Sequence, residues 1–170
     1  MESPSAKASS RRFWYGASVS EFIDASPEAV LVELAFNCDF ALIPTQRDAW
    51  LAEIEFLRHQ LKGLPGSVFF EFNIPRMGRR IDVVLVIDAV VFAIEFKVGE
   101  KTFDRSAIDQ VWDYGLDLKN FHEASHEASI VPYSLRLRQK NVRQSISIAI
   151  PTSFTTRLSS MREVFAELLV

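Results

Sequence analysis

Residues 13–63 place apolar side chains with the period of an α-helix. The clearest helix runs from about residue 45 to Gly63, a residue type that often ends helices. Its apolar stripe is Trp50, Ile54, Leu57 and Leu61. Two shorter helices are predicted before it: one from residue 21, after Ser20, and one from the capping pair Ser26-Pro27 to about residue 36.

From residue 67 the pattern changes to alternation of apolar and polar positions, which is typical of β-strands. Residues 67–75 are one predicted strand, and the sequence RRIDVVLVIDAVVFAIEFKVGE contains two more. In the first of these two, alternation sends Asp82 to one face. The other face is Ile81, Val83, Leu85 and Ile87. In the second, Glu95 and Lys97 share a face.

A two-residue turn at Asp88 and Ala89 would join these two strands as a hairpin. In that register position 87 pairs with 90, 85 with 92, and 82 therefore with 95. Directly opposed residues share a face, with Cβ atoms about 4.5–5.5 Å apart. The sequence thus predicts that Asp82 meets Glu95, whereas a turn of odd length would direct them to different faces.

After the hairpin the helical period returns. A helix is predicted from Asp104, and its apolar stripe is Ala107, Val111, Tyr114, Leu118 and Phe121. A strand near residues 129–135 follows, then a weaker strand candidate at 145–150 and a terminal helix from a capping box at 160–163. The order of helix, three strands, helix and strand predicts an α/β fold.

The length of 170 residues suits one domain, which would bury roughly 70% of the surface of the unfolded chain. Hydrophobic residues make up 48% and charged residues 24%, so residues 13–170 are expected to form a single globular domain. Residues 1–12 are polar and are interpreted as a flexible tail, neither a signal peptide nor a membrane anchor. The lone Cys38 indicates a reducing cytoplasm, and the net charge of −3 argues against a protein that coats DNA.

Asp82, Glu95 and Lys97 are charged residues within runs that otherwise have the composition of buried strands. Unpaired buried carboxylates are strongly unfavourable, and a divalent cation would compensate two that face each other. Carboxylate oxygens suit Mg²⁺ or Mn²⁺ better than zinc. The pattern predicts a metal-dependent phosphodiesterase centre, in which Lys97 positions hydroxide or a phosphate oxygen. The alternative is an ordinary salt bridge on an exposed sheet face.

These residues and this order of elements resemble the PD-(D/E)XK nuclease superfamily. Asp82 and Glu95-Phe96-Lys97 match its Asp and Glu-x-Lys motif position by position, while Ile81 stands at the proline of the motif's name. The resemblance implies a restriction-endonuclease-like core, with a mixed central β-sheet in αβββαβ order flanked by helices. It also implies Mg²⁺ (or Mn²⁺) as cofactor and nucleic acid as substrate.

The resemblance extends to residues outside the two strands. Gln110 and Tyr114 match the QxxxY element of RecB-type members and would orient the metal ligands, Lys97 or the phosphate, although Tyr114 also fits simple core packing. Arg80 and Arg76, close to Asp82 in the sequence, are candidates for contacts to flanking phosphates.

An acidic residue of the preceding helix completes the metal site in the resemblance, and Glu53 is the candidate. Glu55 lies on a different side of that helix. The alternative for Glu53 is an ordinary surface position. Glu71, in the neighbouring strand, is expected to face solvent, with a supporting role at the site as the alternative.

A closer resemblance is to the N-terminal region of bacterial proteins that carry a Schlafen-like DNA/RNA helicase ATPase at their C-terminus. It covers about residues 13–132, through TQRDAWLAEI, IPRMGRRIDVVL, EFKVGE and AIDQVWDYGLDLKNFHE. No Gly-x-x-x-x-Gly-Lys-Ser/Thr loop occurs in this sequence. A helicase or ATPase domain of related longer chains is therefore an expected partner, and truncation of this chain is left open.

Two other functions fit part of the sequence. Residues 122–126 satisfy the H-E-x-x-H pattern of zinc proteases, but they lie at the end of a predicted helix, where the pattern does not continue into apolar helix. A nuclease fold without cleavage activity could bind nucleic acid or dock a partner, although the intact acids and lysine argue against it. The choice between DNA and RNA, and the formation of a homodimer, are left open.

Overall fold

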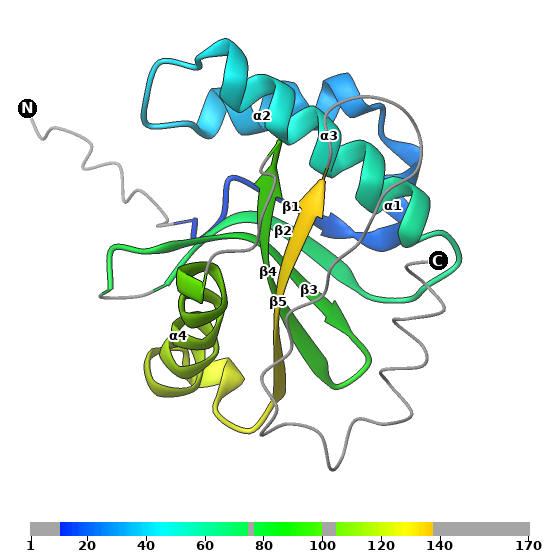
Figure 1. Cartoon of the computed structure of the whole chain (residues 1–170). Coiled ribbons are helices and arrows are strands. Elements are labelled where there is room, and N and C mark those ends of the chain that lie inside the picture. Colours follow the sequence, from blue (N-terminus) through cyan, green and yellow to red (C-terminus); the bar gives the residue numbers. More distant parts are fainter. Residues whose placement is uncertain (1–10, 75–76, 100–104, 138–170) are drawn as a thin grey trace, which may run out of the picture.

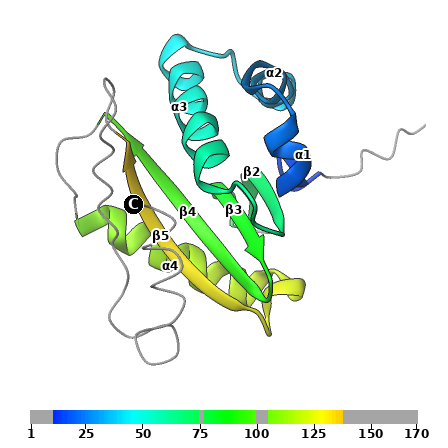
Figure 2. The same cartoon turned by 90° about the vertical axis from the view of Figure 1, so that its right-hand side faces the viewer.

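The computed structural model describes residues 11–74, 77–99 and 105–137, in which one sheet lies between two layers of helices (Figures 1 and 2). Helices α1 to α3 cover one face of the sheet and helix α4 covers the other. The elements in chain order are β1 (Tyr15–Ser18), α1 (Val19–Asp24), α2 (Pro27–Asn37), α3 (Pro44–Gln60), β2 (Ser67–Asn73), β3 (Arg80–Ile87), β4 (Val90–Val98), α4 (Arg105–Phe121), the 3₁₀ helix η1 (Glu123–Ser125) and β5 (Ser129–Leu137).

The five strands lie side by side in their sequence order. Strands β1 to β4 are antiparallel neighbours, whereas β5 runs parallel to β4. Short connections join β2 to β3 and β3 to β4, and helices α1 to α3 lie between β1 and β2 in the chain. A parallel neighbour requires a crossover, and α4 provides it. The elements from α3 to β5 thus follow the predicted order in a mixed sheet. The sequence prediction missed β1, which has only four residues.

Helix starts follow the side-chain caps. Ser18, not Ser20, caps α1, and Glu21 completes a capping box with it. Ser26 caps α2 as predicted, since its side chain accepts a hydrogen bond from the backbone N–H of Ala29. Helix α3 begins at Pro44, whose fixed φ suits a first helical turn.

Apolar side chains form two cores, one on each face of the sheet. The first core lies between the sheet and helices α1 to α3, and it includes Phe22, Leu34, Trp50, Ile54, Leu57, Leu61, Phe70, Val83, Leu85 and Phe92. The second core lies between the sheet and α4, and it includes Phe72, Ile74, Ile81, Val84, Val91, Ala93, Val111, Tyr114 and Leu118. The predicted stripe of α3 is confirmed. In α4 the predicted stripe is confirmed at Val111, Tyr114 and Leu118 but not at Phe121, which is 40% exposed. The side chain of Ala107 lies outside the description.

The predicted alternation of faces is wrong at Ile81. This side chain belongs to the second core, whereas Val83 belongs to the first. Its partner in β2 is Phe72, which also lies in the second core, while Phe70 lies in the first. Between these two pairs Glu71 has a φ of 53°, so the strand changes face at this residue.

Several sequence predictions lie outside the described residues. They are residues 1–10 of the tail predicted over residues 1–12, the strand candidate at 145–150 and the terminal helix from residue 160. Within the ranges that the structure covers, none of the helices is both long and apolar enough to cross a membrane.

Candidate functional site

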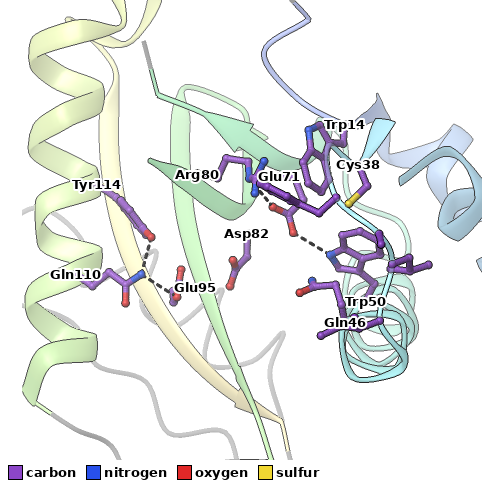
Figure 3. A pocket seen from close by; sticks show the side chains of 14 residues that line it. Trp14, Cys38, Gln46, Trp50, Glu71, Arg80, Asp82, Glu95, Gln110 and Tyr114 are labelled. Carbon is purple, nitrogen blue, oxygen red and sulfur yellow. Dashed lines mark hydrogen bonds and ion pairs between the residues drawn. The ribbon is translucent and has the colours of Figure 1, made fainter. Parts of the chain in front are cut away.

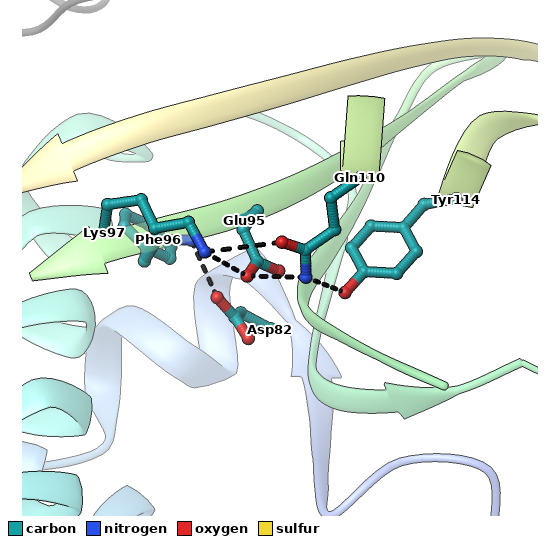
Figure 4. A network of polar contacts seen from close by, with 6 residues as sticks. All are labelled: Asp82, Glu95, Phe96, Lys97, Gln110 and Tyr114. Atoms are coloured by element: carbon teal, nitrogen blue, oxygen red, sulfur yellow. Dashed lines mark hydrogen bonds and ion pairs between the residues drawn. The ribbon is translucent and has the colours of Figure 1, made fainter. Parts of the chain in front are cut away.

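The β3–β4 hairpin has the predicted register near its turn, and this register brings the carboxylates of Asp82 and Glu95 to the end of the hairpin opposite the turn. Pairing runs from the turn as far as Val83 and Ile94, and the next residues are Asp82 and Glu95. Oδ2 of Asp82 accepts a hydrogen bond of 2.7 Å from the backbone N–H of Phe96 (Figure 4). The Asp82 side chain therefore reaches across to β4, beside Glu95.

Glu95 is held through one of its two oxygens. Oε1 accepts a hydrogen bond of 3.0 Å from Nζ of Lys97 and another of 3.0 Å from Nε2 of Gln110. Oε2 is buried and has no hydrogen-bond partner among the described residues. Leaving a buried acceptor unpaired costs about 1–3 kcal/mol. This oxygen is therefore available to accept a hydrogen bond or to bind a cation.

Helix α4 brings Gln110 and Tyr114 to the same point, as the sequence predicted. Nε2 of Gln110 also donates a hydrogen bond of 2.6 Å to Oη of Tyr114, and Oε1 of Gln110 accepts one of 3.4 Å from Lys97. Tyr114 is buried in the second core as well, so the alternative of core packing is confirmed, while its role in orienting metal ligands stays a prediction. Burial, and next the charge of Glu95, raise the pKa of Tyr114, which keeps its proton at neutral pH.

Asp82 lies in an unfavourable place for a charge. Burial raises its pKa well above the ordinary value of 3.8, and the neighbouring charge of Glu95 raises it further. The hydrogen bond from Phe96 and the charge of Lys97 act in the opposite direction. Without a cation, the charged form of Asp82 is therefore destabilised.

Glu53 lies in α3, close enough to Asp82, Glu71 and Glu95 for their charges to affect it. It is 5% exposed, so the alternative of a surface position is wrong, whereas Glu55 is exposed. Burial raises the pKa of Glu53 well above the usual range, and the charges of Asp82, Glu71 and Glu95 add to this effect. Its role as a metal ligand stays a prediction. Across residues 11–74, 77–99 and 105–137, no three His, Cys, Asp or Glu side chains are arranged to hold one ion.

Glu71 corrects the sequence analysis, which expected it to face solvent. Its carboxylate is buried and accepts a hydrogen bond of 2.8 Å from the indole N–H of Trp50. Its other oxygen lies 3.1 Å from Nε of Arg80. Alternation along β2 gave the wrong direction because the backbone of Glu71 adopts a left-handed φ.

Arg80 occupies a defined position beside Glu71. Its guanidinium carbon lies 4.0 Å from the centre of the Trp14 ring, and Nη1 lies 3.6 Å from Oδ2 of Asp39. The predicted phosphate contact of Arg80 stays a prediction. Arg76, the other predicted contact, lies outside the described residues.

These residues surround a pocket of about 460 Å³ (Figure 3). Asp82, Glu95, Gln110 and Tyr114 lie toward β3, β4 and α4, whereas Trp14, Cys38, Gln46 and Trp50 lie on the opposite side. Trp50 belongs to the predicted core stripe of α3, and no pattern in the sequence assigns a role to Trp14. Nothing in the local sequence indicates that both reach the pocket, because α3 and the segment just before β1 bring them there from distant positions.

The H-E-x-x-H residues do not form the helical site of a zinc protease. Helix α4 ends at Phe121, and the motif forms a 3₁₀ turn instead of an α-helix. Nδ1 of His122 and Oγ of Ser125 share a hydrogen bond of 2.6 Å, and the imidazole packs against Phe72. Burial lowers the pKa of His122, and the charge of Arg12 lowers it further. An α-helix presents two imidazoles one turn apart to zinc, and this turn does not.

No family model matches this chain, and no curated protein or solved structure matches it significantly.

Proposed function

We propose that this protein hydrolyses phosphodiester bonds of nucleic acid with Mg²⁺ or Mn²⁺. The observation that carries the proposal is the unpartnered Oε2 of Glu95, buried beside Asp82 among the described residues. The ion pair with Lys97 is made through Oε1 of Glu95, and it leaves Oε2 available to a cation.

The residues fit a small divalent cation. Mg²⁺ binds through one or two carboxylates and keeps several waters, so Asp82 and Glu95 are a sufficient set. A cation between them would remove the repulsion that raises the pKa of Asp82. When bound, such a cation neutralises charge on the phosphoryl group and lowers the pKa of water.

The other polar residues would position these ligands and the substrate. Gln110 holds Oε1 of Glu95, and this leaves Oε2 for the ion. Tyr114, which keeps its proton, holds Gln110 in position by accepting a hydrogen bond from its amide. Lys97 lies at the same oxygen of Glu95 and would stabilise negative charge on a phosphate oxygen.

We further propose that the domain has the restriction-endonuclease-like core of the PD-(D/E)XK superfamily. The order α3, β2, β3, β4, α4, β5 supports this, as does the convergence of Asp82, Glu95, Lys97 and Gln110. On this proposal a helicase or ATPase domain would be the partner in related longer chains.

A nuclease fold without cleavage activity is the second candidate. One observation favours it: in the part of the chain that the structure describes, no three acidic or imidazole side chains form a metal-binding set. Such a protein would bind nucleic acid without a need for divalent cations. The two candidate functions therefore differ in whether Mg²⁺ is required.

Cleavage of labelled single- and double-stranded DNA and RNA in Mg²⁺ or Mn²⁺ tests the proposal. Asp82→Asn, Glu95→Gln and Lys97→Met are each expected to lower kcat by about 100-fold or more. Asp88→Asn is the matched control, because it removes the same charge from an exposed turn of the same hairpin. Equal products from the wild type and the three site variants would mean a contaminant or a wrong site.

Metal binding gives a second readout that does not depend on activity. Mg²⁺ at 100 times its Kd should stabilise the wild type by about 2.7 kcal/mol in thermal unfolding. Glu95→Gln should lose this gain and Asp88→Asn should keep it. Nucleic-acid binding that is unaffected by Mg²⁺, with no cleavage, would favour the silent module.

A further inference from the structure

The pocket beside Asp82 and Glu95 has two chemically different walls. The polar wall carries the proposed catalytic residues. The opposite wall is mainly aromatic and apolar, with Gln46 as a polar member. Its other residues are Trp14, Cys38, Phe40, Ala41, Leu42, Ile43 and Trp50. A pocket of about 460 Å³ can hold a group larger than a phosphate.

Phe40 is the accessible aromatic group of this wall. It is 69% exposed, whereas Trp50 is 1% exposed and serves the first core. The guanidinium of Arg80 lies 5.8 Å from the centre of the Phe40 ring and stacks on Trp14 at 4.0 Å. Glu71 holds Arg80 in this position through the contact of 3.1 Å. The wall therefore presents an exposed ring, Phe40, beside a guanidinium that Glu71 and Trp14 hold in place.

The charges of this wall do not favour binding of a nucleic-acid phosphate backbone. Proteins that follow a nucleic-acid backbone neutralise its phosphates with cationic side chains. Arg80 already has two carboxylate partners, Glu71 and Asp39, and the net charge of the chain is −3. Affinity on this side would come from stacking on a planar apolar group, which every nucleobase offers.

We propose that this wall binds an unpaired nucleobase, stacked on Phe40, while the adjacent phosphate lies at Asp82 and Glu95. The inference rests on the proposed function for the place of that phosphate. Bases inside a duplex are stacked on one another and expose only their edges, so an intact duplex cannot supply this group without unpairing. The substrate is therefore single-stranded DNA or RNA, bound with little sequence preference.

Two further exposed apolar side chains precede Phe40 in the chain, on α2, where Val32 is 67% and Phe36 is 87% exposed. A protein partner docked on this surface would contact Phe36 as well as Phe40. A stacked base would contact Phe40, since Phe36 is not among the residues that line the pocket. The two phenylalanines thus provide a matched pair of substitutions.

Binding is measured by fluorescence anisotropy in Mg²⁺ with full-length Asp82→Asn protein, in which cleavage is expected to be lost. The probes are single strands of about 10 nucleotides, of DNA and of RNA, the DNA duplex, and a DNA strand with abasic central positions. Single strands should bind more tightly than the duplex. Phe40→Ala should weaken single-strand binding about 5- to 100-fold. Phe36→Ala should leave it unchanged, and the abasic strand should bind weakly with or without Phe40.

Three results would overturn the inference: duplex binding as tight as single-strand binding, equal effects of Phe36→Ala and Phe40→Ala, or a loss in Phe40→Ala that persists with the abasic strand. Comparison of the DNA and RNA arms identifies the substrate class. Wild-type cleavage that is insensitive to Phe40 would overturn this inference alone. Single-strand binding that depends on Phe40, without any cleavage by the wild type, would overturn the proposed function alone.

Discussion

The two ends of the β3–β4 pair differ in chemistry although they share one register. Near the turn, residues such as Leu85 and Phe92 pair across the strands and fill the first core. At the other end the pairing stops after Val83, and Asp82 lies beside Glu95. The apolar end fixes the register, and that register directs the charged end. Stability and chemistry are therefore separated along the same strands.

The turn and the site also differ in how a positive φ is accommodated. Asp88 in the turn and Glu71 beside the site both have a φ of 53°. Asp88 is exposed and belongs to a tight turn, where such a conformation is ordinary. Glu71 is buried within a strand, where it persists only if surrounding contacts offset a strain of about 1–3 kcal/mol. Trp50 and Arg80 supply those contacts.

The largest expected effect comes from the apolar end. Phe92→Ala should lower the free energy of unfolding by about 3–5 kcal/mol, because Phe92 is fully buried and its ring lies against Tyr133. Urea unfolding measures the loss, and Phe92→Leu provides a milder variant. Mg²⁺ affinity of the folded protein should be unchanged. A parallel loss of Mg²⁺ affinity in Phe92→Leu would show that the two ends are not separable.

Glu71→Gly should have the next largest effect. Glycine relieves the strained φ, but the Trp50 N–H and Arg80 lose their carboxylate, so we expect a net loss of about 2 kcal/mol in urea unfolding. Fluorescence of the tryptophans should also change, because Trp50 loses its polar partner. If stability stayed the same or rose, the contacts of Glu71 would be too weak to explain its backbone.

The sequence could predict those features that residues near in the chain determine. The stripe of α3 and the register of the hairpin follow from periods and turn length, so the burial of Trp50 and Ile54 and the strand pairing as far as Val83 were predictable. The predicted direct pair of Asp82 with Glu95 is not formed, and Asp82 instead accepts a hydrogen bond from the backbone of Phe96. The resemblance placed Gln110 at Glu95, and the structure brings the two together.

The predictions failed where residues distant in the sequence determine the direction of a side chain. Glu71 is turned inward by Trp50, which is 21 residues away, and Ile81 follows the change of face in the neighbouring strand. Arg80 is positioned by Trp14 and Asp39, which no pattern near Arg80 indicates. A period describes one element, whereas these contacts join several.

Asp82→Asn should stabilise the protein without metal, by about 1 kcal/mol at pH 8. The pKa of Asp82 is higher in the folded state than its ordinary value of 3.8, so its charged form destabilises the fold. Stability should fall as the pH rises from about 4 through the raised pKa, and Asp82→Asn should remove that part of the slope. Urea unfolding in EDTA between pH 4 and pH 8 measures it.

The control for this prediction is Asp88→Asn, which alters an exposed aspartate of the same hairpin. Its unfolding curve should keep the slope of the wild type. A wild-type stability that rose between pH 4 and pH 8, with Asp82→Asn less stable throughout, would mean that Asp82 is held charged by its surroundings. The site would then be a structural ion pair.

The smallest expected effect is a gain from Asp88→Gly at the turn. Two-residue hairpin turns favour glycine where φ is positive, and the greater freedom of glycine in the unfolded chain offsets part of this, so we expect a gain of about 0.5 kcal/mol. Asp88→Ala should lose about 1 kcal/mol, because alanine is less tolerant of this φ. Neither variant should alter Mg²⁺ affinity.

Glycine would thus stabilise the fold at one residue with a φ of 53° and destabilise it at the other, because only Glu71 is held by buried contacts. Gains or losses of the same sign at both positions would mean that backbone conformation alone sets the effect, and the distinction between the two ends would fail.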